Sequence, residues 1–302
     1  MAPNEQTWPA LDYPAWQDTC ATLQLWTQII GKVRLALAPP VNHWWHVPLY
    51  LTARGLTTSP MPYGGGSLQI DFDFIAHRLR IDLSDGRQDG FALAPRSVAE
   101  FYDDFIGRLR GLGIDVGIWT TPVEVADPIP FEHDRQHAGY DADAVNRFWR
   151  ALLLVDQVFT DFRGRFLGKA SPVHFFWGSF DLAVTRFSGR RAAPPPSNPM
   201  IPDRVNHEAY SHEVSSCGFW PGNGGFGQAA FYSYAYPQPV GFGEAPITVP
   251  GAFYSKEIGE FVLPYDSIRQ TDRPRELLMQ FLQETYLAAA ELAQWDRAAL
   301  ER

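Results

Sequence analysis

The sequence predicts an α+β protein in which a helix–antiparallel sheet–helix unit occurs twice, the two copies being related by a pseudo-two-fold axis. Three observations predict this fold class. Four segments repeat apolar residues at intervals of three and four, as helices do. The segments between them alternate in polarity or are rich in aromatic residues, as strands are. One aromatic motif also recurs in the second half of the chain.

Two helices are predicted in the first half. From Trp16 an apolar stripe continues to Leu37, where the following prolines end the helix. The second helix begins after Ser97, because Ser97 and Glu100 have the spacing of a capping box.

Two further helices are predicted in the second half. One runs from about Asp141 with an aromatic apolar side. The last begins near Asp272 and has Pro274 in its first turn, where the missing N–H group does no harm.

The predicted strands lie between these helices. The clearest is 67–74, in which Ile70, Phe72 and Phe74 share one face. The full set is 43–56, 67–74, 79–83, 174–187, 210–219, 228–236 and 260–263. Because strands joined by short turns usually pair with their sequence neighbours, we expect antiparallel sheets covered by the helices.

An internal repeat predicts the duplication. Residues 43–51 (HWWHVPLYL) and 174–182 (HFFWGSFDL) share the histidine, the aromatic pair and the final leucine at an offset of 174 − 43 = 131. Proline- and glycine-rich insertions account for the greater length of the second half. We therefore expect a first repeat at 1–135 and a second at 136–302, forming one compact unit. The alternative is a chance similarity between two aromatic strands that each follow a helix.

The composition excludes several classes of protein. With 25 Lys and Arg against 34 Asp and Glu, the net charge of −9 argues against a general nucleic-acid or anionic-membrane binder. Two cysteines are too few for a disulfide framework or a thiolate zinc site. The first ten residues (MAPNEQTWPA) do not have the pattern of a signal peptide, and no apolar run is long enough to span a membrane. A soluble, cytoplasmic protein is the expectation.

No cofactor and no metal are expected. Residues 222–227 (GNGGFG) match the glycine pattern of dinucleotide-binding loops, but an aromatic strand follows them instead of a helix. Residues 207–212 (HEAYSH) have one residue too many for the zinc-protease helix motif, and they have the pattern of a strand.

The best candidate for chemistry is segment 210–222. His212 and Glu213 suit acid–base work, and Asp181 is an unusual carboxylate inside an aromatic strand. We predict these three as catalytic residues. Alternation places Ser216 and Trp220 on the same face as His212, so both are predicted to bind the ligand.

Further ligand-binding residues are predicted near the repeated motif. They are His43, His46, His174, Trp177 and Arg186. His43 and His174 are equivalent in the repeat and could both approach the pseudo-axis, whereas Arg186 could neutralise an acidic ligand. The alternative is that the histidines cap strands and bond to backbone, and that the polar residues of 210–222 form an internal hydrogen-bond network or a solvated face.

These motifs resemble an uncharacterised bacterial family. The residues that carry the resemblance are 43–46 (HWWH), 174–182 with 186–190 (RFSGR), and 210–213 with 218–222 (GFWPG). They are similar to a domain of unknown function, number 5996, and the resemblance covers nearly the whole chain from Trp8. It implies a soluble unit of this length and carries over no activity and no functional residues.

Three functions remain open from the sequence. The first is an enzyme that acts on a small polar organic molecule by histidine and carboxylate chemistry in a groove between the repeats. The second is a non-catalytic small-ligand-binding or sensor module, and the third a structural or interaction protein. The first requires Asp181 to lie near His212 or Glu213. The oligomeric state is not predicted.

Overall fold

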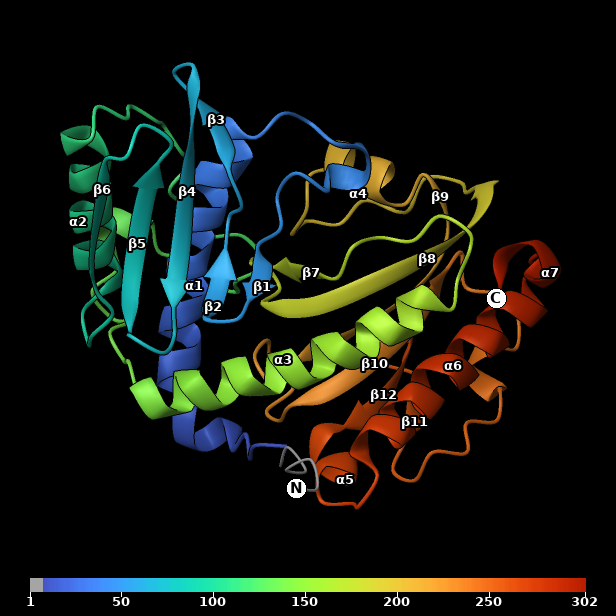
Figure 1. The fold of residues 1–302 in the computed structure, drawn as a ribbon. Coiled ribbons are helices and arrows are strands. Elements are labelled where there is room, and N and C mark those ends of the chain that lie inside the picture. Colours follow the sequence, from blue (N-terminus) through green and yellow to red (C-terminus); the bar gives the residue numbers. More distant parts are fainter. Residues whose placement is uncertain (1–7) are drawn as a thin grey trace, which may run out of the picture.

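Two antiparallel sheets and seven α-helices make up the described part of the protein, which confirms the α+β class (Figure 1). The computed structural model describes residues 8–302. The predicted absence of a signal peptide concerns in part residues 1–7, which lie outside the described residues.

The first half forms one sheet of six strands. In chain order its elements are α1 (Tyr13–Leu37), the 3-10 turn η1 (Asn42–Trp44), β1 (Tyr50–Thr52), β2 (Gly55–Thr57), β3 (Met61–Tyr63), β4 (Gly66–Asp73), β5 (Arg78–Leu83), β6 (Gln88–Ala92), α2 (Val98–Gly111) and the 3-10 turn η2 (Phe131–His133). The strand order is β1-β2-β4-β5-β6, and β3 pairs with β4. Ile70 and Phe72 of β4 are buried, as their alternation predicts.

The second half forms another six-stranded sheet. Its elements are α3 (Ala142–Gly164), β7 (His174–Phe176), β8 (Asp181–Arg191), α4 (Asp203–Ala209), β9 (His212–Trp220), β10 (Ala230–Tyr236), the 3-10 turn η3 (Phe242–Glu244), β11 (Phe253–Ser255), β12 (Glu260–Pro264), α5 (Tyr265–Arg269), α6 (Pro274–Leu292) and α7 (Arg297–Leu300). The strand order is β11-β12-β10-β9-β8-β7.

The predicted helix ends are confirmed. Ser97 and Glu100 form the capping box at the start of α2, and Asp141 caps α3 by accepting from the N–H groups of Asp143 and Ala144. Pro274 occupies the first turn of α6.

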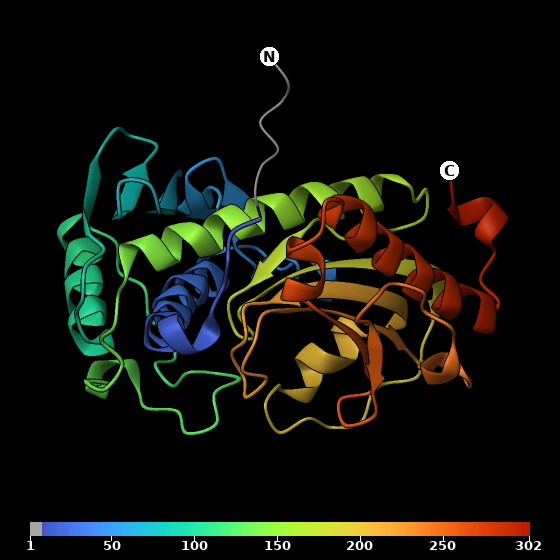
Figure 2. The ribbon, with the colours of Figure 1, turned by 90° about the horizontal axis from the view of Figure 1, so that it is seen from below.

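The two sheets meet edge to edge. Leu49, just before β1, and Phe175 of β7 exchange two backbone hydrogen bonds of 2.9 and 3.0 Å. The helix α3 runs along both halves, and α3 and α6 cover one face of the second sheet while α4 lies on the opposite side (Figure 2). Buried apolar residues from both halves form one continuous core. Whether the halves descend from a duplication stays a prediction.

Three predicted strands differ from the structure. The strand expected at 174–187 is two antiparallel strands, β7 and β8, joined by a turn at 177–180. His43 and Trp44 have φ angles of 59° and 61° and belong to η1, so the strand expected at 43–56 begins only at Tyr50. A left-handed backbone cannot continue a strand ladder. His207 and Glu208 lie in the helix α4, not in a strand, and His212 begins β9.

None of the helices among residues 8–302 has the length and apolar character needed to cross a membrane.

Candidate active site

The face of the second sheet that is turned away from α3 and α6 carries polar and aromatic side chains. Strand alternation and register place Asp181 of β8, Ser216, Gly218 and Trp220 of β9, and Tyr232 of β10 on this face. The opposite face is apolar and packs on the helices through residues such as Val184 and Phe219.

The helix α1 brings a distant loop to this face. Its buried Gln28 donates to the carbonyl oxygen of Val123 at 2.9 Å and accepts from the N–H of Val123 at 3.0 Å. One turn further along, Lys32 donates to the carbonyl oxygens of Trp119 and Thr121. Burial lowers the pKa of Lys32 to about 8. These bonds fix segment 119–123, and the next residue is Glu124.

Glu124 is held in an unusual conformation beside Gly178. Its φ of 55° lies in the left-handed region, which costs free energy for a residue other than glycine. Its carboxyl group packs so closely on Gly178 that a side chain at position 178 would collide with it. Gln24 of α1 fixes the same turn by donating to the carbonyl oxygen of Gly178 at 2.7 Å.

Asp181 is the most deeply buried carboxylate of the face, with only 3% of its surface exposed. Tyr232 donates its hydroxyl to one carboxyl oxygen and Ser179 donates to the other, both at 2.5 Å. Burial raises the pKa of Asp181 to about 6, although the two hydroxyl bonds act in the opposite direction. The net effect moves the pKa of Asp181 towards neutral pH.

A glycine makes the Tyr232 bond possible. The ring of Tyr232 crosses β9 directly over Gly218, where a methyl group would collide with the phenol. Trp220 stacks on Tyr232 with a centroid distance of 4.3 Å.

Two more carboxyl groups lie near enough to Asp181 to be affected by its charge. Burial, and then the charge of Asp181, raises the pKa of Glu124 to about 7 and that of Glu260 to about 8. Among residues 8–302, no lysine, arginine or histidine forms an ion pair with Asp181, Glu124 or Glu260. We call these three residues the acidic cluster. Glu124 and Glu260 are each half-buried, whereas Asp181 is buried.

A chain of hydroxyl groups continues along the face from this cluster. Tyr210 and Tyr234 share a hydrogen bond of 2.8 Å, and so do Thr185 and Ser216. Burial raises the pKa of Tyr234 well above its usual value, so its phenol stays protonated.

The three predicted catalytic residues do not meet. His212 and Asp181 share a sheet face, but Asp181 lies beside Trp220 at one end of β9 and His212 forms the other end. Eight residues of strand separate these ends, a distance of about 26 Å at 3.3 Å per residue. Glu213 points to the other face, where Arg190 donates to it at 2.7 Å.

The predicted ligand residues lie on the polar face of the second sheet, near His212, or at structural positions. Trp220 and Ser216 belong to the face just described. Trp177 donates its indole N–H to the carbonyl oxygen of Val47 at 2.8 Å, which joins the two halves. His46 accepts from the N–H of Val41 at 3.1 Å. His43 lies near His212, at a centroid distance of 5.8 Å.

His174 and Arg186 are buried, with 1% and 0% of their surfaces exposed. Burial, followed by the charges of Arg34 and Arg163, lowers the pKa of His174 to about 3, so its ring is neutral. Arg186 faces the helices, lies over the ring of Phe162 at 3.4 Å and donates to the carbonyl oxygen of the same residue. Both therefore lie within packed surroundings away from the acidic cluster.

The sequence reasoning missed Glu124, Glu260 and Tyr232. Tyrosines at 232, 234 and 236 alternate along one strand, and that pattern could have placed a phenol beside the small residues Ser216 and Gly218. No pattern in the sequence predicts the place of Glu124, because its position depends on contacts of the preceding segment with Gln28 and Lys32, about ninety residues earlier.

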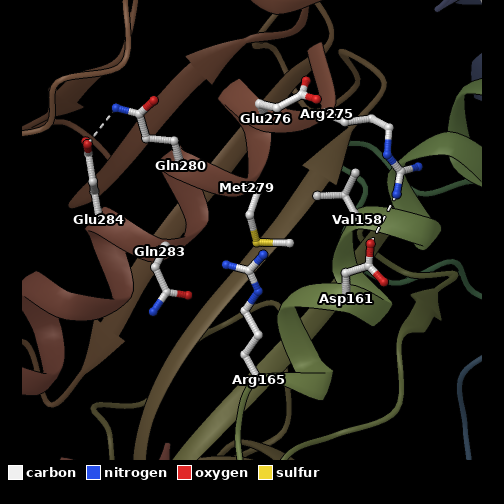
Figure 3. A pocket seen from close by; sticks show the side chains of 9 residues that line it. All are labelled: Val158, Asp161, Arg165, Arg275, Glu276, Met279, Gln280, Gln283 and Glu284. Atoms are coloured by element: carbon white, nitrogen blue, oxygen red, sulfur yellow. Dashed lines mark hydrogen bonds and ion pairs between the residues drawn. The ribbon is translucent and has the colours of Figure 1, made fainter. Parts of the chain in front are cut away.

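A groove of about 480 Å³ lies elsewhere, between α3 and α6 (Figure 3). Arg275 of α6 and Asp161 of α3 form an ion pair of 3.1 Å along its side, and both side chains are exposed. The groove is on the helical side of the second sheet, away from the acidic cluster. Its charged groups are paired or solvated, so it does not concentrate reactive groups as the cluster does.

Comparisons with known proteins give a family and no activity. A family model described as "Family of unknown function (DUF5996)" matches residues 8–302. No curated protein and no solved structure gives a significant match. Within residues 8–302, no three His, Cys, Asp or Glu side chains are grouped so as to hold a metal ion.

Proposed function

Since this chain belongs to the family of unknown function DUF5996, membership supplies no activity, and we propose from the geometry that it is an enzyme. It would act on a small polar organic molecule by general acid–base chemistry at the acidic cluster. The proposal differs from the sequence prediction in one respect. The proton-transfer groups are carboxyl and phenol groups, because His212 lies at the far end of β9.

The observation that carries the proposal is the environment of Asp181. Acid–base catalysis needs groups that gain and lose protons near the working pH. Asp181, Glu124 and Glu260 have pKa values raised to about 6, 7 and 8, so at neutral pH protonated and ionised carboxyl groups coexist in one cluster. Neighbouring carboxyl groups in different protonation states are the arrangement that separates an acid from a base.

Asp181 and Glu124 then have different roles. Asp181 is oriented by two hydroxyl groups and is the more acidic, so it would accept a proton from the substrate. Glu124 and Glu260 would be the proton donors, since more of each remains protonated at pH 7. The stacked rings of Trp220 and Tyr232 would form an apolar wall beside the substrate.

A second function has one observation in its favour. Carboxyl groups without a described cationic partner, placed beside aromatic ring faces, also suit the non-catalytic binding of an organic cation. In that case the same cluster retains an amine and leaves it unchanged.

One experiment separates the two functions. The wild-type protein, Asp181→Asn and Tyr232→Phe are each incubated with an extract of small metabolites, which is followed by mass spectrometry over time. Asp82→Asn is the matched control, because Asp82 lies on β5 beside Arg80, at 3.2 Å, in the first sheet. Circular dichroism checks that each variant is folded.

The enzyme proposal predicts that one metabolite disappears as another appears. Wild type and Asp82→Asn should convert it at the same rate, while Asp181→Asn should be about 100-fold slower or more. A cationic metabolite that wild type retains without conversion, and Asp181→Asn releases, would instead support the binding function. No conversion and no retention, or equal conversion by Asp181→Asn, would overturn the proposed site.

A further inference from the structure

A group of basic side chains gathers at the end of β9 that is remote from Asp181. It consists of His43 of η1, Lys169 in the segment after α3, Arg191 at the end of β8 and His212 at the start of β9. Arg191 and His212 are paired neighbours in the sheet. We call these four residues the basic cluster.

The contacts of His43 fix its protonation state. Its Nδ1 lies 3.1 and 3.2 Å from the carbonyl oxygens of Glu208 and Ala209. A nitrogen that faces two acceptors must carry the proton, so the Nε2 atom is an acceptor. Lys169 donates its ammonium group to this Nε2 at 2.6 Å. His43 is therefore neutral, and Lys169 carries the positive charge.

Aromatic rings hold Lys169 in place and leave its charge unneutralised. The ammonium nitrogen lies 5.2 Å from the ring centre of Trp45 and 5.1 Å from that of Phe187. Lys169 and Arg191 are exposed. Among residues 8–302, no carboxylate forms an ion pair with Lys169, Arg191 or His212.

The positive charges in the cluster contribute to lowering the pKa values of its two histidines. Burial, then the charge of Lys169, lowers the pKa of His43, and the charges of Lys169 and Arg191 add to burial in lowering that of His212. The nearest carboxyl groups along the chain are Glu208 and Glu213. The first is exposed on α4, and the second is bonded to Arg190 on the other face of β9.

We propose that the basic cluster is a binding site for an oxyanion, namely a phosphate or carboxylate group of a small ligand. The N–H groups of Lys169 that do not bond His43, together with the guanidinium of Arg191, would hold the anion. His212 would add a ring N–H from its Nε2 atom in the tautomer whose Nδ1 accepts from the hydroxyl group of Ser211, 3.1 Å away. The bound charge would replace the repulsion among the cations with attraction.

This site is separate from the proposed base Asp181. About 26 Å of β9 lies between His212 and the neighbourhood of Asp181, which is too far for one small molecule to bridge, whereas Glu260 lies level with Ser216 in the middle of the strand. The basic cluster could therefore bind an anionic effector or a second ligand, whether or not the acidic cluster is catalytic.

The lysine content of the chain allows a direct test. There are three lysines: Lys169 in the cluster, buried Lys32, and exposed Lys256 on the turn between β11 and β12. Limited acetylation with an N-hydroxysuccinimide ester, followed by mass spectrometry of peptides, measures the reaction rate of each. Lys256 is the internal control for reagent and pH, and unreacted Lys32 reports that the protein stays folded.

Inorganic phosphate and acetate are the two probes. At about ten times its dissociation constant, an anion that covers Lys169 should slow acetylation of this residue about tenfold and leave Lys256 unchanged. Protection by phosphate alone identifies a phosphate site, and protection by both probes identifies a general oxyanion site. Arg191→Gln should weaken the protection. Equal effects on Lys169 and Lys256, or no saturable protection by either probe, would overturn the proposal.

Discussion

The two ends of β9 differ in charge although they lie on one face of one sheet. Among residues 8–302, no cationic side chain forms an ion pair with Asp181 at the Trp220 end, and no carboxylate forms an ion pair with the basic cluster at the His212 end. The ends are about 26 Å apart, several times the screening length of about 8 Å at physiological ionic strength, so they do not neutralise each other.

This difference teaches that net charge is a poor guide to a local site. A chain of charge −9 excludes a broad basic surface, yet it contains a group of basic side chains, two of them the cations Lys169 and Arg191. At both ends burial disfavours the charged forms, which raises the carboxyl pKa values at one end and lowers the histidine pKa values at the other.

The largest loss of stability is expected when Gly218, near the Trp220 end of β9, is replaced by alanine. Gly218→Ala places a Cβ against the ring of Tyr232, which must move and release its bond to Asp181. Overpacking and the loss of a partner for a buried carboxylate together predict a decrease of about 2–4 kcal/mol in the free energy of unfolding. Urea denaturation measures it.

The matched control for this substitution is Gly107→Ala. Gly107 is exposed on α2 with open space around its Cα, so an added methyl group should stabilise the helix by about 0.5–1 kcal/mol. If Gly218→Ala were as stable as wild type, the close contact between Tyr232 and β9 would not be needed for the acidic end.

The second largest effect is on the pH dependence of stability, to which the two ends of β9 should contribute with opposite signs. A carboxyl group with a raised folded-state pKa stabilises the protein at low pH, and this contribution is lost as the pH rises through the folded value. For Asp181, from 3.8 to about 6, the contribution is up to about 3 kcal/mol. The histidines, with lowered pKa values, act in the other direction and favour folding as the pH rises through the ordinary value of 6.5.

Asp181→Asn separates these two contributions. It leaves the basic cluster intact, so the variant should gain stability relative to wild type as the pH rises from 5 to 8. Denaturation at both pH values measures the change, and Asp82→Asn should follow wild type. A constant difference between Asp181→Asn and wild type would mean that Asp181 has an ordinary pKa in the folded protein.

The fold followed from the sequence more completely than the site did. Helix ends are local, so Ser97 with Glu100, Asp141 and Pro274 predicted them correctly. Asp181 also stood out, as a carboxylate within an aromatic strand. Its neighbours did not, because Glu124 is positioned by buried Gln28 and Lys32 of α1, and Glu260 by the register of β12. Such long-range polar contacts leave no periodic pattern.

The backbone conformation of His43 explains why the predicted equivalence of His43 and His174 fails. The sequence predicted His43 in a strand equivalent to that of His174, but His43 has a left-handed backbone and His174 lies in β7. The turn is what directs the His43 ring to Lys169 and His212. A motif match thus placed two histidines in the same role although their surroundings differ.

The smallest effect is expected at the basic end. Lys169→Met removes an exposed charge and keeps much of the apolar stem, so the free energy of unfolding should change by no more than about 1 kcal/mol. The pKa of His212 should rise, because the charge of Lys169 contributes to lowering it. Nuclear magnetic resonance of the histidine ring signals measures this titration. Lys256→Met, the matched removal of an exposed lysine, should leave it unchanged. A pKa of His212 that is the same in both variants would mean that Lys169 and His212 do not share one site, and the contrast between the two ends of β9 would then rest on the acidic cluster alone.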